Sequence, residues 1–438
     1  MRKRMRILGA MFQGGGNIPL LMPIMARLVE RGHTVRIIAG PGIRRSRLPV
    51  STQFAQRIAE SGASLIPFHT PDKHPFDDAP PLRGLLGNWV PRPFRRTERQ
   101  TALWSAAWAE NVSAALRREA ADLVVADFFL LGALAAAEAA RVRSVALMHC
   151  VSVCPIAGVP PWGTGWLPYR TPIGFARDVL GRAALTYLDR RNALKSLNDV
   201  RTSLGLQPLT STFEQYDHAS RVLILVSRSF DFLGKPSANV LHVGTPVEDT
   251  KAPAWSSPWP ASDQQPLVVV SLSTLNQGQA PLMRRILRAL GALDVRALVT
   301  LGPALDPAEF TAPPNAILEP FVPHSAVLPQ AAALVTQCGI GTLTKGLVCG
   351  VPLVCIPLGG DQPDNAARVV ARGAGIRIGK EASPERIAAA IERVLTNPQY
   401  RTAARRLGSS ILNEGDAVAE RGRGNRAATG GHFNESVT

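Results

Sequence analysis

The chain has 438 residues, 46% of them apolar and 19% charged, which is typical of a folded globular protein and not of a disordered or fibrous one. Its 49 basic residues exceed its 33 acidic residues by 16, and residues 1–50 alone hold ten basic residues against one acidic residue. Only seven of the 49 basic residues are lysines, so the excess of positive charge reflects a bias toward arginine. The sequence also has no paired Cys/His zinc spacing and no RNP-like run, which argues against nucleic-acid binding. A basic face toward an anionic ligand or a membrane surface stays open.

The five cysteines are odd in number and lie in apolar surroundings, which indicates a reduced, cytoplasmic chain. Cys150 and Cys154 have neither a second cysteine pair nor a histidine pair at metal spacing, so we expect no metal site. No apolar run reaches the roughly 18 residues of a membrane helix. The basic N-terminus is followed by a short strand-like run and glycines rather than by the apolar stretch of a signal peptide.

The elements of the N-terminal half alternate between strand and helix. An apolar run at 6–12 leads into three glycines, then a helix at 19–31 and a strand at 34–39, which together form a βαβ unit. A helix that ends near Ala121 is followed by a strand at 123–126, an alanine-rich helix at 130–140 and a strand at 142–148. This alternation predicts a parallel, doubly wound sheet with helices on both faces.

Two stretches interrupt the alternation, and we expect both to be long loops at the carboxyl edge of this sheet. They are residues 69–100, rich in proline and arginine, and residues 154–173. The proline-rich segment 246–266 is interpreted as a linker, so the predicted domains are 1–245 and 267–414, with a flexible tail at 415–438. The second domain is also expected to be α/β, with strands at 267–271, 296–301, 316–318, 332–336 and 352–357.

The strongest local signal is the segment 335–342, where a buried strand runs into a glycine turn and a helix opens near Gly341 and Thr342. Glycines allow close approach of a ligand, and the first N–H groups of the helix favour a phosphate. After the next strand, Asp361 and Gln362 stand on a glycine loop and suit sugar hydroxyls. The simpler alternatives are a tight turn without a ligand and an aspartate that caps the helix starting near Pro363.

Competing phosphate motifs are missing, since there is no GxxxxGK[ST], and the N-terminal glycines lack the full GxGxxG spacing with its following acid. The order of motifs resembles the donor-binding signature of the family 1 glycosyltransferases, which are nucleotide-sugar-dependent enzymes of GT-B fold, and in particular their bacterial natural-product and lipid branch. The segments that carry the resemblance are 15–19, 31–33, 158–163, 230–232, 271–274, 321–324, 335–342, 350–352 and 361–362. It spans roughly residues 5–408 and implies two Rossmann-like domains that face a cleft.

The resemblance also implies roles for individual residues. Ser273 and Thr274 would touch the diphosphate, and the backbone from Val322 to His324 would hold the base. The phosphates would lie against Gln337, Gly339, Gly341 and Thr342, and the sugar hydroxyls would bind Asp361 and Gln362. The acceptor side would include Gly16, Asn17 and Trp162, with Trp89 and Trp166 as further flat apolar surface or simply as loop packing.

Three positions depart from the family pattern. Gln337 stands where a histidine is usual, so it can donate a hydrogen bond but cannot be cationic. Lys345 replaces a glutamate that binds ribose hydroxyls, which leaves the nucleotide open between UDP and dTDP. The usual catalytic histidine is replaced by Gly16.

The missing histidine leaves several candidates for the general base. Asp127, at the end of its strand, can act directly if burial raises its pKa, or it can merely cap a helix. His149 ends the next strand and is the second candidate. His69 and His74 lie in the long loop and could reach an acceptor on closure, although most loop histidines are simply solvated.

These observations predict a cytoplasmic glycosyltransferase of natural-product metabolism that moves a sugar from a UDP- or dTDP-sugar to a hydroxyl or phenol of a hydrophobic small molecule or lipid, with inversion. The resemblance implies no cofactor and no metal, and contact with a membrane periphery stays open. The alternative is an impaired relative that binds a nucleotide and assists another enzyme. An epimerase ranks last because the sugar motif offers only Asp361 and Asp364 as acids.

Overall fold

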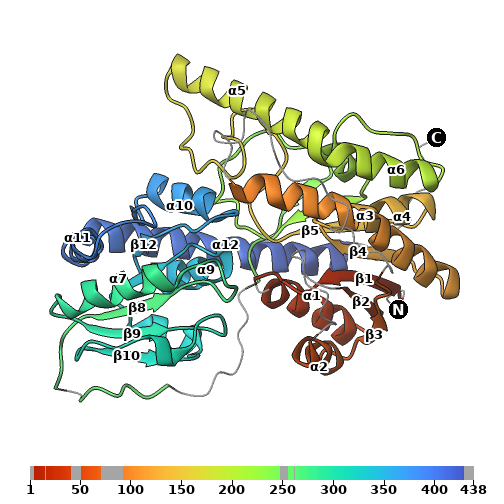
Figure 1. Cartoon of the computed structure of the whole chain (residues 1–438). Helices are drawn as coiled ribbons and strands as arrows, with labels where there is room; N and C mark the ends of the chain where they lie inside the picture. Colours follow the sequence, from red (N-terminus) through yellow and green to blue (C-terminus); the bar gives the residue numbers. More distant parts are fainter. Residues whose placement is uncertain are drawn as a thin grey trace.

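The computed structural model describes residues 4–14, 16–40, 51–70, 92–246, 255–260 and 262–428, with the backbone alone described at 92–103 and 415–428. In this part of the chain, thirteen strands form two separate, fully parallel sheets (Figure 1). The first sheet has seven strands in the order β3-β2-β1-β4-β5-β6-β7. Their bounds are β1 Arg6–Phe12, β2 Thr34–Gly40, β3 Ser64–Pro67, β4 Leu123–Asp127, β5 Ser144–Met148, β6 Arg221–Ile224 and β7 Val240–His242.

The second sheet has six strands in the order β10-β9-β8-β11-β12-β13. Their bounds are β8 Leu267–Ser271, β9 Arg296–Thr300, β10 Ala316–Glu319, β11 Ala333–Thr336, β12 Leu353–Cys355 and β13 Gly375–Arg377. All residues of β8 and β11 are buried, as continuous apolar strands are when helices cover both faces of a parallel sheet. The predicted doubly wound parallel sheets are therefore confirmed.

Helices follow most strands and cover both sheets (Figure 1). In the first half they are α1 Ile18–Glu30, α2 Thr52–Glu60, α3 Arg92–Arg118, α4 Leu131–Ala139, α5 Pro172–Asp189 and α6 Lys195–Ser203. In the second half they are α7 Ala280–Gly291, α8 His324–Val327, α9 Ile340–Val348, α10 Gln362–Ala371, α11 Pro384–Thr396 and α12 Pro398–Ala428. Among the residues described, none of the helices combines the length and the apolar character that crossing a membrane requires.

Two boundary predictions are wrong. Residues 92–100, expected to belong to a loop, are the first turns of α3, which packs on α4. Residues 415–428, expected to begin a flexible tail without regular structure, continue α12 as a helix. Residues 71–91, the larger part of the first expected loop, and residues 429–438 lie outside the described part of the chain, whereas residues 154–170 are irregular as expected.

The two halves are joined by helix α12, which leaves the second half and runs toward the first (Figure 1). Glu414 on this helix accepts hydrogen bonds from the Ser227 hydroxyl and from the backbone N–H groups of Arg228 and Ser229, at 2.5 to 2.8 Å, in the loop that follows β6. The return helix therefore fastens the second half of the chain to the end of a strand in the first.

Candidate active site

The polar residues singled out in the sequence gather where the strand order of each sheet reverses. In the first sheet β1 lies beside β4, and in the second sheet β8 lies beside β11. In open parallel sheets, ligands bind outside the carboxyl ends of the strands at such switch points. Asn17 follows β1, Asp127 is the last residue of β4, and His149 follows β5. In the second sheet Ser273, Gln337 and Asp361 follow β8, β11 and β12.

Asp127 is the centre of a buried polar cluster in the first half. Its carboxylate is 1% exposed and accepts hydrogen bonds from the Asn17 amide at 3.0 Å and from the Phe129 N–H at 3.1 Å. The His149 Nε2 atom lies 3.3 Å from the same carboxylate, and its ring packs edge-on against Phe128. Asp127 makes no capping bond to α4, whose N-cap is Leu130, so the helix-cap alternative is wrong. The structure brings both predicted base candidates into one contact.

Position 16 is open. A Cβ atom built on Gly16 would meet none of the described atoms within 4 Å, so the backbone here leaves room for the start of a side chain. The contact with Asp127 is made instead by the next residue, Asn17, whose amide also donates to the Phe12 carbonyl. An amide cannot take up a proton near neutral pH, so Asn17 holds Asp127 but cannot act as a base.

His149 lies under the influence of two carboxylates from different halves of the chain. Burial disfavours its charged form, but Asp127 and, more weakly, Asp361 outweigh this effect and raise the pKa of His149. Asp361 stands on the glycine loop after β12, which is the loop predicted to bind the sugar. The His149 side chain is 15% exposed, and its Nε2 atom is buried.

The predicted phosphate-binding turn is a strand-to-helix junction with strained backbone. Cys338 follows β11 with φ +71°, a conformation that side-chain-bearing residues seldom adopt, and Gly339 is the N-cap of α9. The first intrahelical bond runs from the Leu343 N–H to the Gly339 carbonyl, so the N–H groups of Gly341 and Thr342 in the first turn have no such partner. Their position at the positive end of a nine-residue helix suits a phosphate.

Gln337 is buried just before this turn. Its side-chain carbonyl accepts from the Thr336 hydroxyl at 3.2 Å, and a Cβ on Gly339 would lie 3.2 Å from its amide nitrogen. The amide N–H groups of Gln337 therefore point toward the turn. A neutral donor occupies the place where the family has a histidine.

Asp361 occupies the N-cap position of α10 but makes no side-chain cap bond, so the capping alternative is wrong here too. Its carboxylate accepts from the Asn365 amide at 2.8 Å, and the same amide donates to the Cys338 carbonyl at 2.9 Å. Asn365, which sequence analysis missed, thus links the sugar loop to the phosphate turn. Burial raises the pKa of Asp361, although Asn365 and His149 oppose the shift.

The Gln362 side chain is largely committed to its own loop. Its carbonyl accepts from the N–H groups of Leu358 and Gly359, and its amide donates to Gln277 at 3.1 Å. Gln277 belongs to the loop after β8 that carries Ser273 and Thr274, where Thr274 is exposed and the Ser273 hydroxyl accepts from the Leu275 N–H. Gln362 therefore braces the two donor loops against each other.

The segment expected to hold the nucleobase of the donor begins with an exposed aromatic ring. Phe321 is 77% exposed, Val322 is buried and His324 opens α8. Burial and the nearby Lys345 lower the pKa of His324 to about 4, so its ring is neutral at physiological pH. Phe321 was missed as a candidate of its own, although an aromatic residue at the head of this motif is the signal that points to base stacking.

The remaining candidates are dispersed. Trp162 is half-buried against the core of the first half, and Trp166 lies under the Arg177 guanidinium at 4.7 Å. His69 is exposed, and its backbone is held by Asn111. His74 and Trp89 lie outside the described residues, and within those that are described no group of three His, Cys, Asp or Glu residues could hold a metal.

Comparisons with known proteins agree with this geometry. The family model described as "Erythromycin biosynthesis protein CIII-like, C-terminal domain" matches residues 284–418. The chain is 28% identical to 4'-demethylrebeccamycin synthase of Lentzea aerocolonigenes, over 92% of this chain and 94% of that protein.

Two solved structures share the fold. The kitacinnamycin glycosyltransferase has a TM-score of 0.71 at 20% identity and covers 97% of this chain and 99% of its own. The glycosyltransferase VinC in complex with dTDP has a TM-score of 0.63 at 21% identity and covers 95% of this chain and 100% of its own. The chain therefore has the GT-B fold, and its similarity to named glycosyltransferases supports a glycosyltransferase of the bacterial natural-product type.

Proposed function

We propose that the chain moves a sugar from a dTDP- or UDP-sugar to a hydroxyl or phenol group of a hydrophobic small molecule, with inversion at the anomeric carbon. The observation that carries the proposal is the buried pair of His149 and Asp127, whose Nε2 atom and carboxylate lie 3.3 Å apart at the carboxyl edge of the first sheet, while Gln337 and Asp361 follow strands β11 and β12 at the carboxyl edge of the second. The whole-length similarity to 4'-demethylrebeccamycin synthase supports an acceptor of natural-product type.

In this mechanism His149 is the general base. Its Nε2 side faces Asp127, which orients the ring and stabilises the imidazolium that forms. The acceptor hydroxyl gives its proton to the imidazole, the acceptor oxygen forms a bond to the anomeric carbon, and the bond from that carbon to the diphosphate oxygen breaks. The nucleoside diphosphate leaves from the opposite face, which inverts the anomeric centre.

The donor would lie along the carboxyl edge of the second sheet. The N–H groups of Gly341 and Thr342 and the Gln337 amide would stabilise the charge on the departing diphosphate, so no metal ion is required. The sugar would contact Asp361. The nucleobase would lie against Phe321 and the backbone near Val322. VinC was solved with dTDP, which supports a thymidine nucleotide here, and Lys345 in place of a ribose-binding carboxylate fits a deoxyribose as well.

Exposed apolar side chains lie near the acceptor side. Of the thirteen large hydrophobic residues that are exposed in the described chain, seven fall between Leu167 and Tyr187, at the end of the irregular segment 154–170 and on the helix α5 that follows it. Such a surface suits a hydrophobic acceptor. The five cysteines are all free, which supports a cytoplasmic location.

The test is nucleotide release by purified protein incubated with a panel of dTDP- and UDP-sugars and pooled aromatic and lipid alcohols. We expect release that depends on the acceptor, one preferred nucleotide, and loss of turnover in Asp361→Ala. Binding of a nucleotide without turnover across the panel would contradict the proposal and favour an auxiliary protein. Anomeric configuration of the isolated product by NMR tests inversion separately.

A further inference from the structure

A loop of the first half is tied directly to the sugar-binding helix of the second half. The carboxylate of Asp364, in the first turn of α10, accepts hydrogen bonds from the N–H groups of Gly163 and Gly165 at 2.5 and 2.8 Å. The Arg377 guanidinium, at the end of β13, donates to the Gly165 carbonyl at 2.5 Å. Three hydrogen bonds thus hold two residues of the segment 154–170 to elements about 200 positions away in the sequence.

The fit between loop and helix is close. Gly165 has φ +64°, and a Cβ atom on it would lie 2.7 Å from the Pro363 Cβ and 2.9 Å from the Pro363 carbonyl oxygen. Any side chain at this position would therefore push the loop away from α10. Asp364 itself is 4% exposed, so its carboxylate is committed to the loop and not to solvent.

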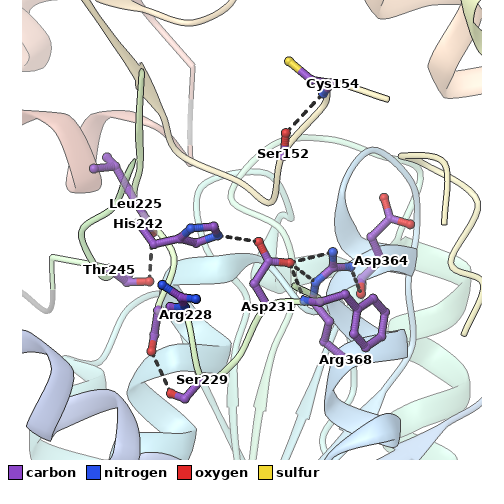
Figure 2. Close-up of polar contacts among 12 residues, drawn as sticks. Ser152, Cys154, Leu225, Arg228, Ser229, Asp231, His242, Thr245, Asp364 and Arg368 are labelled. Atoms are coloured by element: carbon purple, nitrogen blue, oxygen red, sulfur yellow. Dashed lines mark hydrogen bonds and ion pairs between the residues drawn. The ribbon is translucent and has the colours of Figure 1, made fainter. Parts of the chain in front are cut away.

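The helix that receives the loop is itself fixed. Arg368, one turn after Asp364, donates to the Asp364 carbonyl and forms an ion pair with Asp231 at 2.7 Å, and Asp231 accepts from His242 on its other side (Figure 2). The loop therefore docks on a rigid platform. Because Asp361 is the N-cap of the same helix, the platform also carries the sugar-binding carboxylate.

We propose that Asp364 is a positioning residue that docks the loop containing Trp162 against the sugar-binding helix and so sets where the acceptor stands relative to the donor sugar. The inference rests on the proposed transferase function and adds to it a named coupling between the two substrate sites. Trp162 directly precedes Gly163, so releasing the two N–H groups would free the segment that we assign to the acceptor. We expect binding of the nucleotide at α9 to be independent of this contact, because Asp364 bonds the loop and not α9.

The experiment compares Asp364→Asn and Gly165→Ala with the unchanged protein. The control is Asp199→Asn, because Asp199 is an exposed residue of α6 that pairs with Lys195 on the same helix. An asparagine can present one acceptor oxygen but turns an N–H toward the second glycine N–H. We expect both variants to raise the KM of the acceptor about tenfold or more and to raise the share of donor lost to hydrolysis. The Kd of the nucleoside diphosphate, measured by calorimetry, should change less than twofold.

The outcomes separate the two proposals. If the unchanged protein transfers no sugar, the proposed function fails. If it transfers sugar and both variants keep the acceptor KM and the hydrolysis share of the unchanged protein, the role of Asp364 is overturned while the function stands. If both variants lose nucleotide binding together with acceptor binding, Asp364 supports the fold in general, and the specific coupling is likewise overturned. Since the two substitutions act from opposite sides of the contact, poor folding of one leaves the other to decide.

Discussion

At the scale of single residues, the proposed catalysis depends on how His149 keeps a proton affinity suited to a base. An imidazole in an apolar pocket would lose its proton readily, but the Asp127 carboxylate at 3.3 Å and the more distant Asp361 favour the protonated ring. The pKa of His149 is raised as a result. A base with raised proton affinity accepts a proton from a hydroxyl more readily, provided that it is neutral at the start.

The activity should therefore fall in acid. The base must be neutral, so kcat/KM declines as the pH decreases through the raised pKa of His149, which lies above the ordinary value of about 6.5. In His149→Gln we expect kcat to fall by about 10²-fold or more, and the remaining activity to lose this acid limb. The measurement is the pH profile of nucleotide release for both proteins with a saturating donor.

A rescue distinguishes a lost base from a disturbed pocket. Position 16 has room for a side chain, and its neighbour Asn17 already contacts Asp127. Gly16→His in the His149→Gln background should restore part of kcat, whereas Gly16→Ala in the same background should not. An acid limb that persists in His149→Gln would show that another group sets the pH dependence.

Some of these residue roles could be read from the sequence and others could not. Asp127 was identified from the family resemblance and His149 from the strand that precedes it, and the pairing of β4 with β5 in the structure is what brings the two together. Two other contacts depend on side-chain torsions that no spacing specifies. One is the hydrogen bond from Asn17 to Asp127. The other is the set of bonds made by the Gln362 side chain, which accepts from Leu358 and Gly359 and donates to Gln277.

At the scale of elements, the donor site is made of separate loops that must keep their distances. Asn365 is fully buried and bridges two of them, since its amide bonds both the Cys338 carbonyl and the Asp361 carboxylate. The strained backbone at Cys338 is thereby held from the side of α10. The sugar loop and the phosphate turn behave as one unit because of this single amide.

Removing that amide should affect the donor and not the acceptor. Asn365→Ala leaves the buried Cys338 carbonyl without its partner, which costs about 1–3 kcal/mol, and it removes a bond that lowers the pKa of Asp361. We expect the KM of the nucleotide sugar to rise about tenfold with little change in the acceptor KM. Initial rates with each substrate varied in turn provide the measurement.

The matched control is Asn315→Ala. The Asn315 amide also bonds backbone carbonyls within the second half, those of Leu290, Leu293 and Val295, but at the start of β10 and away from the donor loops. It should lower stability without moving the KM of the donor. Equal changes in donor KM for both variants would contradict the bridging role of Asn365.

Element prediction succeeded where a segment was long and periodic. The bounds of β1 and β8 coincide with the predicted runs, but β7 and β13 have three residues each, too few for any pattern to emerge. Helix α12 past residue 415 was missed because its glycines and arginines carry no apolar period, and part of what holds it is the distant contact of Glu414.

At the scale of the whole molecule, the halves are joined by a buried ion pair. Asp231, 3% exposed, lies between His242 and Arg368 (Figure 2), and its main-chain carbonyl accepts from Arg372 at 2.7 Å. Burial alone would raise the pKa of Asp231, but Arg368 and His242 outweigh burial and lower it. The carboxylate is therefore ionised in the folded protein and balances a buried guanidinium.

Asp231→Asn should destabilise the protein strongly because it leaves the Arg368 cation buried without its counter-ion. The expected loss in the free energy of unfolding is about 3–5 kcal/mol, measured by urea unfolding followed by tryptophan fluorescence. Since the pKa of Asp231 is lower in the folded state, its stabilisation is present above the ordinary pKa of aspartate, about 4, and is lost as the pH falls through the native value. The difference in the free energy of unfolding between the variant and the unchanged protein should therefore be largest at pH 7 and decrease in acid.

The double variant Asp231→Asn with Arg368→Met tests the cause. If the cost arises from the unpaired cation, replacing the cation by an apolar side chain of similar length should recover most of the loss, because methionine can also pack on Phe232, over which the guanidinium now lies at 4.3 Å. A double variant as unstable as the sum of the two single variants would mean that Asp231 acts through its contacts with His242. The ion pair between the halves would then contribute little, and the contacts of Glu414 and Asp364 would remain to join them.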